Sequence, residues 1–215
     1  MPDSDRDTVD GPTIDRLDPA RRDEAIAASS RAFWPDPLFG WFARDEVHEH
    51  RVLPIFLGAL LRDALVDGEV WAATERGRVL GSASWLPPGA IPRPFARELR
   101  IYAACARALL SCRNRRTGLR LLDAVERAHP TEPHWHLALL GVDPGHQRRG
   151  LGSALLRPVL DRCDRDLDAA YLETQKPDNL VYYERFGFRV IDEIRVADSP
   201  TVWLMWRDPD PDRVA

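Results

Sequence analysis

The stretch Gly141–Leu156, GVDPGHQRRGLGSALL, decides how the second half of the chain folds. The run His134–Val142 leads into it and is apolar on both faces, which is typical of a strand inside a covered sheet. The DPG that follows predicts a turn, and helical spacing of apolar residues begins after Gly150. We therefore expect a strand, a short loop and a helix N-terminus in direct succession.

The loop between this strand and helix has the composition of an anion site. Free N–H groups and the helix dipole attract anions at a helix N-terminus. Gly150 and Gly152 add no bulk there, and Arg148 and Arg149 add positive charge. The loop lacks the third glycine of a dinucleotide fingerprint, and the chain has no GxxxxGK[ST] motif. A turn that merely needs two glycines remains the alternative.

Composition narrows the class of protein. The chain has 215 residues, 44% hydrophobic and 30% charged, which excludes wholesale disorder, collagen and coiled coil. Its apolar runs fall short of the roughly 20 residues of a membrane span, and its net charge of −4 argues against general nucleic-acid binding. Three cysteines without a CxxC pair suit reduced thiols. We expect a cytoplasmic protein that binds neither nucleic acid nor membrane.

The remaining patterns predict a mixed α/β sheet with helices on both faces. Prolines interrupt FWPDPLFGWF, which reads as a loop, and Pro158 predicts a kink or early stop. We expect one domain over 12–207, with a helical insert at about 90–130 and flexible ends at 1–11 and 208–215. The expected strands are 13–17, 69–74, 78–85, 134–142, 170–174, 188–196 and 201–206. One expected helix begins at Pro19, and the other expected helices are 51–65, 94–111, 117–127, 150–160 and 179–186.

Two motifs in this order resemble the GNAT N-acetyltransferase superfamily. One is Q-x-x-G-x-G from Gln147, after the strand end V-D-P, and the other is LETQKPDNLVYYERFGF, Leu172–Phe188. The resemblance implies the GNAT acyl-CoA N-acyltransferase fold. HPTEPHWH, His129–His136, and the N-L-x-x-Y-E-R-x-G-F stretch look most like the puromycin N-acetyltransferase branch. The long insert between Trp85 and Pro130 departs from the minimal fold and leaves the acceptor side open.

The resemblance also implies roles for individual residues. Backbone groups at the end of the 134–142 strand would pair with the pantetheine arm of acetyl-CoA, and amides of the loop would hold its pyrophosphate. Asn179 would lie near the pantetheine, and Tyr183 near the cofactor sulfur. The expected acetyl-CoA-binding residues are Leu140, Gly141, Val142, Gln147, Arg148, Arg149, Gly150, Leu151, Gly152, Ser153, Ala154 and Asn179.

Acetyl transfer to an amine needs a proton donor for the leaving thiolate and an acceptor for the amine proton. A tyrosine, with a pKa of about 10, can protonate a thiolate of pKa about 8.5, so Tyr183 is the candidate acid and Tyr182 its alternate. Glu173 is the first candidate base. His134, His136 or a chain of waters are the alternatives. His-x-His alone is a weak metal signal, and we expect no metal.

The aromatic segment Phe33–Phe42 is the candidate acceptor wall. Aromatic faces bind apolar bodies and attract cationic amines. We expect Asp36, Phe39 and Trp41, with Trp85 from the hairpin, at this pocket. The alternative is that these rings are simply core.

Together these patterns predict an acetyl-CoA-dependent N-acetyltransferase acting on a primary amine of a small molecule. Neither motif holds a cysteine that could form an acyl-enzyme, which favours direct attack in a ternary complex. The alternatives are a protein N-terminal or lysine acetyltransferase and a CoA-binding sensor without transfer activity. A monomer or homodimer is expected.

Overall fold

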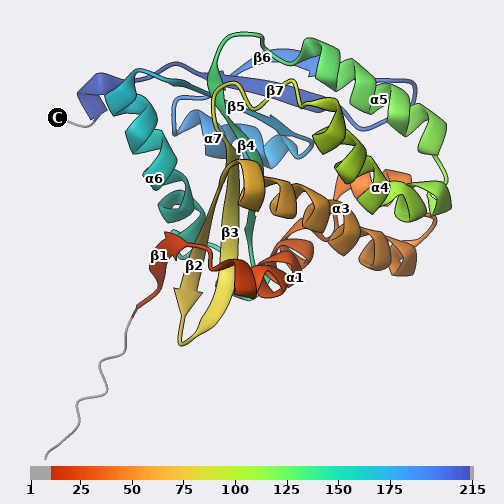
Figure 1. The fold of residues 1–215 in the computed structure, drawn as a ribbon, viewed down its shortest axis with the longest axis horizontal. Helices are drawn as coiled ribbons and strands as arrows, with labels where there is room; N and C mark the ends of the chain where they lie inside the picture. The colour runs from red at the N-terminus through yellow and green to blue at the C-terminus, as the bar shows by residue number, and fades with distance from the viewer. Residues whose placement is uncertain (1–10, 214–215) are drawn as a thin grey trace, which may run out of the picture.

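A computed structural model describes residues 11–213, which form one central sheet with helices on both faces (Figure 1). The described part of the sheet has the order β1-β2-β3-β4-β5-β7-β6. Only β4 and β5 pair in parallel; the other neighbours are antiparallel. The mixed α/β class predicted from the sequence is confirmed. The strands are β1 Thr13–Arg16, β2 Glu69–Glu75, β3 Arg78–Leu86, β4 His134–Val142, β5 Ala169–Thr174, β6 Arg189–Ile194 and β7 Val202–Arg207.

The helices divide between the two faces of the sheet (Figure 1). On one face, buried side chains of α6 pack with Trp135 and Leu137 of β4 and with Tyr183 of α7. On the other face, α1 and α3 cover β2 and β3, and Leu121 of α5 packs on β5 and β7. The helices are α1 Arg22–Phe33, α2 Pro37–Phe42, α3 Glu46–Asp67, α4 Phe95–Ser111, α5 Arg115–Ala128, α6 Leu151–Asp166 and α7 Pro177–Glu184.

Three helices differ from the sequence expectation. The expected loop FWPDPLFGWF contains α2, because Asp36 caps its N-terminus and Pro37 occupies the first turn. Helix α3 begins earlier than expected, where Asp45 accepts a hydrogen bond from the His48 N–H. Helix α6 runs through Pro158 to Asp166, since buried side chains on both sides of the proline hold it to the sheet.

Strand β4 carries an irregularity that the sequence did not reveal. Trp85 pairs with Leu137 and Ser84 with Leu139, so Ala138 is an extra, unpaired residue. This β-bulge reverses the alternation of side chains. Before it, Leu137 faces α6; after it, Leu139 faces α1 and α3 while Leu140 packs toward α6.

The same point of β4 is where the sheet opens. The parallel pairing with β5 runs from His134–Ala169 to Leu137–Leu172, and residues 138–142 have no partner on β5. This leaves a gap between β4 and β5 beside the start of α6.

The ends of the domain differ in what the structure describes. Residues 1–10 lie outside the described residues, so the expected flexible N-terminus at 1–11 stays a prediction. At the other end, where a flexible tail is expected, the backbone N–H of Asp210 donates to Asp164 and Arg189 pairs with Asp208. The expected insert forms α4 and α5. No helix in the described range 11–213 is long and apolar enough to cross a membrane.

Candidate active site

The loop before α6 leaves the helix N-terminus free to bind an anion. Gly150 is the N-cap residue, with a left-handed φ of 79°, and it provides no capping side chain. The first N–H groups of α6 therefore have no intrahelical acceptor. Gln147 fixes the loop by donating its side-chain N–H to the Val142 carbonyl at 3.1 Å. Arg149 is already paired with Glu75 at 2.6 Å, whereas Arg148 is exposed.

Gly152, inside the first turn of α6, is required for packing. A Cβ at this position would lie 2.8 Å from the Tyr182 hydroxyl oxygen, too close for an ordinary contact. Helices α6 and α7 therefore approach each other closely at this glycine.

A cavity of about 630 Å³ runs from that gap to the helices of the insert. It is lined mainly by aromatic and aliphatic side chains, as ligand sites usually are. Among the residues expected to bind acetyl-CoA, those that line it are Leu140, Gly141, Val142, Gln147 and Asn179. Asn179 is held by donating to the Thr174 hydroxyl at 2.9 Å. A strand gap whose backbone has no partner on β5, followed by an uncapped helix N-terminus, fits an extended thioester that ends in a pyrophosphate.

Three histidines and one glutamate form a hydrogen-bonded chain at the cavity. His136 Nε2 lies 2.8 Å from Glu173 Oε2, and His129 Nδ1 lies 3.5 Å from Glu173 Oε1. His129 Nε2 is 3.1 Å from His134 Nε2, and His134 Nδ1 is 2.7 Å from the Glu132 carbonyl oxygen. His129, His136 and Glu173 line the cavity.

The partners of these rings determine where their protons lie. A carbonyl oxygen only accepts, so His134 carries its proton on Nδ1 and accepts from His129 with Nε2. Burial lowers the pKa of His134 to about 4, so this ring is neutral at neutral pH. In its neutral form, with the Nε2 proton donated to the carboxylate, His136 has a lone pair on Nδ1, a buried atom without a partner among the described residues.

Glu173 is ionised in this environment. Burial by itself would raise the pKa of Glu173, but the charge and hydrogen bonds of His136 and His129 outweigh it and hold this pKa below its usual range. Such a carboxylate is a poor acceptor of an amine proton and a good partner for an imidazolium ring.

Tyr183, the candidate acid, lines the cavity and is buried. Burial raises its pKa, with a smaller contribution from Tyr182, so the hydroxyl keeps its proton at neutral pH. Tyr182 does not line the cavity; its ring packs under Arg185, with 5.2 Å between the guanidinium carbon and the ring centroid. The geometry therefore favours Tyr183 over Tyr182.

The four residues expected at the acceptor pocket are divided. Asp36 and Phe39 line the cavity. The Asp36 carboxylate accepts hydrogen bonds from the Leu38 and Phe39 N–H groups of α2. It lies 3.9 Å from the Lys176 ammonium, and burial raises the pKa of Asp36. Trp85 is completely buried in the core against α6. Trp41 packs against Phe42 beside α4. The structure thus places neither tryptophan at the cavity, because one fills the sheet core and the other a junction between helices.

Sequence reasoning assigned no role to His129 or to the cavity faces of α4 and α5. His129 caps the C-terminus of α5 and meets Glu173 only through the fold, so local sequence carried no signal for the contact. The helices present Glu98, Ile101, Tyr102, Cys105, Leu109, Leu121, Leu122, Val125 and Glu126 to the cavity. The three- and four-residue spacing of these side chains along α4 and α5 is the sequence signal that could have predicted the two cavity-facing stripes.

Among residues 11–213, no group of three or more His, Cys, Asp or Glu side chains is arranged to hold a metal ion. The three cysteines are free and buried.

The sheet, its gap and the loop before α6 are those of an acyltransferase. Residues 30–188 match the model of the Acetyltransferase (GNAT) family, and the chain therefore belongs to this family of N-acetyltransferases.

Individual relatives resemble the chain in sequence, and solved structures resemble it in fold. The chain is 29% identical over 139 residues to "N-alpha-acetyltransferase RimI" of Mycobacterium tuberculosis, covering 63% of this chain and 79% of that protein. Its fold is similar to a histone acetyltransferase HPA2-related acetyltransferase from Corynebacterium glutamicum, with a TM-score of 0.68, 23% identity and coverage of 94% and 98%. A polyamine N-acetyltransferase from Drosophila melanogaster, which forms N-acetylagmatine, has a TM-score of 0.61, 17% identity and coverage of 92% and 100%.

Proposed function

We propose that this enzyme transfers the acetyl group of acetyl-CoA to a primary amine of a small molecule, by direct attack in a ternary complex. The supporting observation is the cavity of about 630 Å³, in which apolar and aromatic walls lead to His136, Glu173 and Tyr183. Its volume falls within the range of about 300–1,000 Å³ usual for small-molecule sites.

The residues of the chain divide the work of this transfer. The N–H groups at the start of α6 hold the pyrophosphate of acetyl-CoA, and the unpaired part of β4 binds the pantetheine arm. When bound, acetyl-CoA supplies a thioester carbon that the amine nitrogen attacks, so that a C–N bond forms and the C–S bond breaks. Tyr183 then gives its hydroxyl proton to the thiolate sulfur.

His136 is the acceptor of the amine proton in this proposal, and Glu173 orients it. The lone pair on His136 Nδ1 is unpartnered among the described residues, whereas both oxygens of Glu173 face histidines. Glu173 fixes the tautomer and stabilises the positive charge that develops on the ring. This assignment replaces Glu173 as the base with a His136–Glu173 pair.

A protein N-terminus is the second candidate acceptor, because the relative RimI is named an N-alpha-acetyltransferase. The similarity of the HPTEPHWH and N-L-x-x-Y-E-R-x-G-F stretches to the puromycin N-acetyltransferase branch stays a prediction. The free cysteines support a cytoplasmic location, and a monomer or homodimer remains the expected assembly.

The test is a release assay for free CoA, with acetyl-CoA and a panel of small amines, aminonucleosides and short peptides with free N-termini. We expect turnover with small amines at least about 10-fold above that with peptides, because a cavity of about 630 Å³ with apolar walls favours small acceptors. Preference for peptides would move the acceptor to protein N-termini. Tight acetyl-CoA binding without turnover on any amine would instead indicate a CoA-binding sensor.

A further inference from the structure

The carboxylate of Glu173 has two ion-pair partners, and both are histidines. Among the described residues, its oxygens meet His136 Nε2 at 2.8 Å and His129 Nδ1 at 3.5 Å, and no arginine or lysine pairs with it. The side chain of Glu173 is only 18% exposed. A carboxylate shielded from water in this way needs a positive partner to stay ionised. One of the two imidazole rings therefore supplies the counter-charge, and the hydrogen bonds indicate which one.

The direction of these hydrogen bonds can be followed from the Glu132 carbonyl oxygen. This oxygen only accepts, and it lies 2.7 Å from His134 Nδ1, so that nitrogen carries a proton. Because burial lowers the pKa of His134 to about 4, the ring is neutral at neutral pH and its Nε2 bears a lone pair. The Nε2 atom of His129, 3.1 Å away, is then the donor of this contact. His129 thus carries a proton on Nε2.

The other ring nitrogen of His129 faces the carboxylate. Without a proton on Nδ1, its lone pair would face Glu173 Oε1 across 3.5 Å, and two acceptors would repel each other. With a proton there, both ring nitrogens of His129 are protonated and the contact becomes an ion pair. His136 needs only its Nε2 proton to satisfy the contact with Glu173. The hydrogen-bond geometry therefore favours a positive charge on His129 and a neutral ring at His136.

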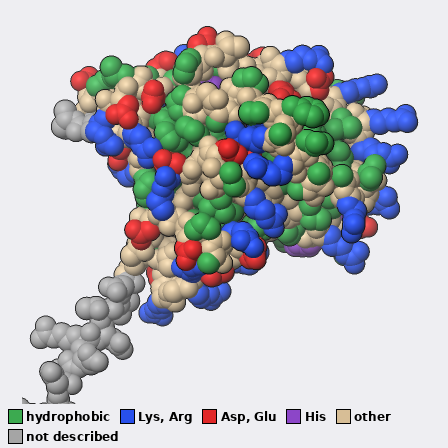
Figure 2. All heavy atoms as spheres, in the orientation of Figure 1, with side chains coloured by type: hydrophobic (Ala, Val, Ile, Leu, Met, Phe, Trp, Pro, Cys, Tyr) green, Lys and Arg blue, Asp and Glu red, His purple; other side chains and the backbone are tan. Residues whose placement is uncertain are grey.

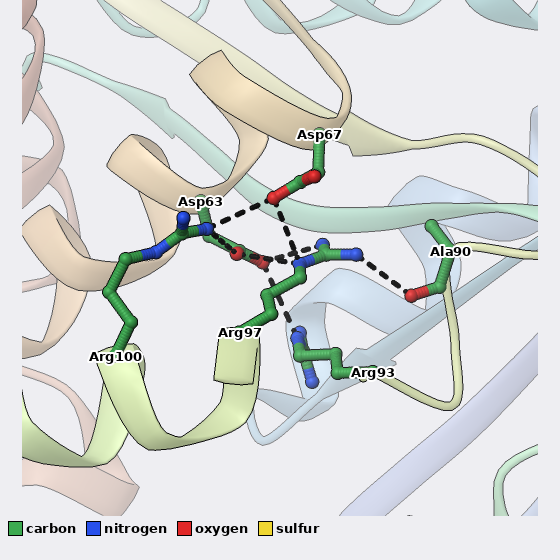
Figure 3. Close-up of polar contacts among 6 residues, drawn as sticks. All are labelled: Asp63, Asp67, Ala90, Arg93, Arg97 and Arg100. Carbon is green, nitrogen blue, oxygen red and sulfur yellow. Dashed lines mark hydrogen bonds and ion pairs between the residues drawn. The ribbon is translucent and has the colours of Figure 1, made fainter. Parts of the chain in front are cut away.

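The other cations near the cavity are engaged elsewhere. Arg93 pairs with Asp63 at 3.4 Å, within the arginine cluster drawn in Figure 3. Lys176 lies 3.9 Å from Asp36. Basic side chains at the end of the molecule that carries α4 and α5 extend outward from the surface (Figure 2). The charge of Glu173 is thus left to the imidazole rings.

Titratable side chains face the His129 ring from two strands. Its centroid lies 5.0 Å from that of His134, 5.2 Å from that of His136 and 4.6 Å from that of Tyr171. Burial raises the pKa of Tyr171, so its hydroxyl stays neutral. Carboxylates on the neighbouring helix, loop and strand are exposed to solvent: Glu126 of α5, Glu132 before β4 and Asp192 of β6. Among the described residues, Glu173 is therefore the buried carboxylate that pairs with His129.

A positive charge on His129 determines what His136 can do. An uncompensated carboxylate beside His136 would favour a second proton on its ring, and a doubly protonated ring cannot accept a proton from an amine. A cation at His129 compensates Glu173 and also opposes a second charge on the nearby ring of His136. The Nδ1 lone pair of His136, which has no partner among the described residues, then stays available.

We propose that His129 is a positioning residue that carries the counter-charge of Glu173 and so keeps His136 neutral and able to accept the amine proton. The inference rests on the role proposed for His136 in acetyl transfer. His134 holds the ring of His129 by accepting from its Nε2. The chain ends at the Glu132 carbonyl oxygen, which takes up no proton, so these two rings hold protons in place and do not conduct them.

Nitrogen NMR of the imidazole side chains tests the charge of His129 without any turnover. The chain has six histidines, and the variants His129→Gln, His134→Gln and His136→Gln assign the three signals of interest. At neutral pH we expect both nitrogens of His129 to give the shifts of an imidazolium. His136 should be neutral with its proton on Nε2, and His134 neutral with its proton on Nδ1. A neutral His129, or an imidazolium at His136, would overturn the inference.

The pH dependence of kcat/KM tests the consequence for His136. One acceptor amine is used throughout, so that its own titration contributes equally to every profile. In His129→Asn the amide can still donate to Glu173 but carries no charge. We expect the acid limb of its profile to move to higher pH by at least about one unit, because an uncompensated carboxylate favours a protonated His136. His129→Lys restores a positive charge and should return the limb toward that of the wild type.

The outcomes separate this inference from the proposed function. A loss of rate in His129→Asn with an unshifted acid limb, or a shift that persists in His129→Lys, overturns the role of the His129 charge and leaves acetyl transfer standing. His50→Gln, at an exposed position, is the control and should keep the wild-type profile. Absence of turnover with every amine overturns the proposed function, while the imidazole signals still decide the charge. Circular dichroism checks the fold of each variant, and where a His129 variant does not fold, the signals of the wild-type protein decide.

Discussion

His136 Nε2 on β4 and Glu173 Oε2 on β5 lie 2.8 Å apart across the two parallel strands, just where their pairing ends. In the proposed mechanism, this pair places the acceptor of the amine proton beside the site where acetyl-CoA would bind. His136 contributes an Nδ1 atom that has no hydrogen-bond partner among the described residues, and Glu173 contributes a carboxylate beside the ring.

Removing either member of this pair should slow acetyl transfer with little effect on acetyl-CoA binding. For His136→Gln we expect kcat/KM for the amine to fall about 10²-fold or more. Glu173→Gln should also lower it, because the ring loses its partner for the protonated state. Steady-state kinetics and calorimetry with acetyl-CoA measure the two effects. His50→Gln, at an exposed position, is the control; wild-type rates in His136→Gln would assign the proton to another acceptor.

The hydroxyl of Tyr183 should contribute to turnover but hardly to cofactor affinity. Tyr183→Phe keeps the ring and removes the proton donor, so we expect kcat to fall by about 10²-fold. Tyr182→Phe is the matched control, since this neighbour lies outside the cavity lining, and its kcat should stay within a few-fold of wild type. Equal losses in the two variants would mean that both rings serve packing.

A negative charge in the first turn of α6 should weaken acetyl-CoA binding while it stabilises the helix. Ser153→Asp places a carboxylate where the dipole stabilises it, yet repels a pyrophosphate at the same N–H groups. We expect the Kd for acetyl-CoA to rise at least about 10-fold, with thermal stability unchanged or higher. Ser153→Asn has nearly the same shape without the charge and should bind much more tightly than Ser153→Asp. Identical affinities for the two variants would contradict an anion site here.

Stability should depend on pH through His134. Its folded-state pKa of about 4 lies below the ordinary histidine value of 6.5, because burial opposes the charged ring. The unfolded chain therefore binds the proton more readily, so this contribution is present above about pH 6.5 and is lost as the pH falls toward 4. Melting temperatures of wild type and His134→Gln from pH 7.5 to 4 measure it. The variant should have the shallower slope, and parallel curves would rule out His134.

Asp63 should be important for the docking of α4 on α3. It is 2% exposed and faces Arg93, Arg97 and Arg100. Asp63→Asn leaves the buried Arg97 with only the more exposed Asp67 as a counter-charge, and breaking a buried ion pair costs about 3–5 kcal/mol in comparable cases. Asp67→Asn, at a more exposed carboxylate of the same network, should cost about 1 kcal/mol or less. Urea denaturation measures both, and equal losses would remove the special role of Asp63.

Much of the fold followed from local pattern. Apolar periodicity and the V-D-P and Q-x-x-G-x-G motifs located β4, the loop and the start of α6 close to their observed bounds. Helix α2 was missed although its signal was present, because Asp36 and Pro37 form an N-cap and first-turn pair. The continuation of α6 past Pro158 depends on burial against the sheet, which local propensity does not report.

The site was less accessible from sequence than the fold. Glu173 and Tyr183 could be singled out from a motif, but the partners of Glu173 come from β4 and from the end of α5. The bulge at Ala138 left no mark in a run that is apolar throughout. Trp85 and Trp41 show the opposite problem, since aromatic density alone does not separate a pocket wall from a core.

The extra residue at Ala138 turns the side chains of β4 from one face of the sheet to the other, at the point where the sheet opens between β4 and β5. Because of it, His136 faces the side of α5 while Leu140, farther along the same strand, packs toward α6. In the proposed reaction, donor and acceptor then approach from opposite sides and meet only in the opening between β4 and β5. We therefore expect each to enter and leave without displacing the other. Changes on α4 and α5 can then alter the choice of amine while the donor side stays as it is.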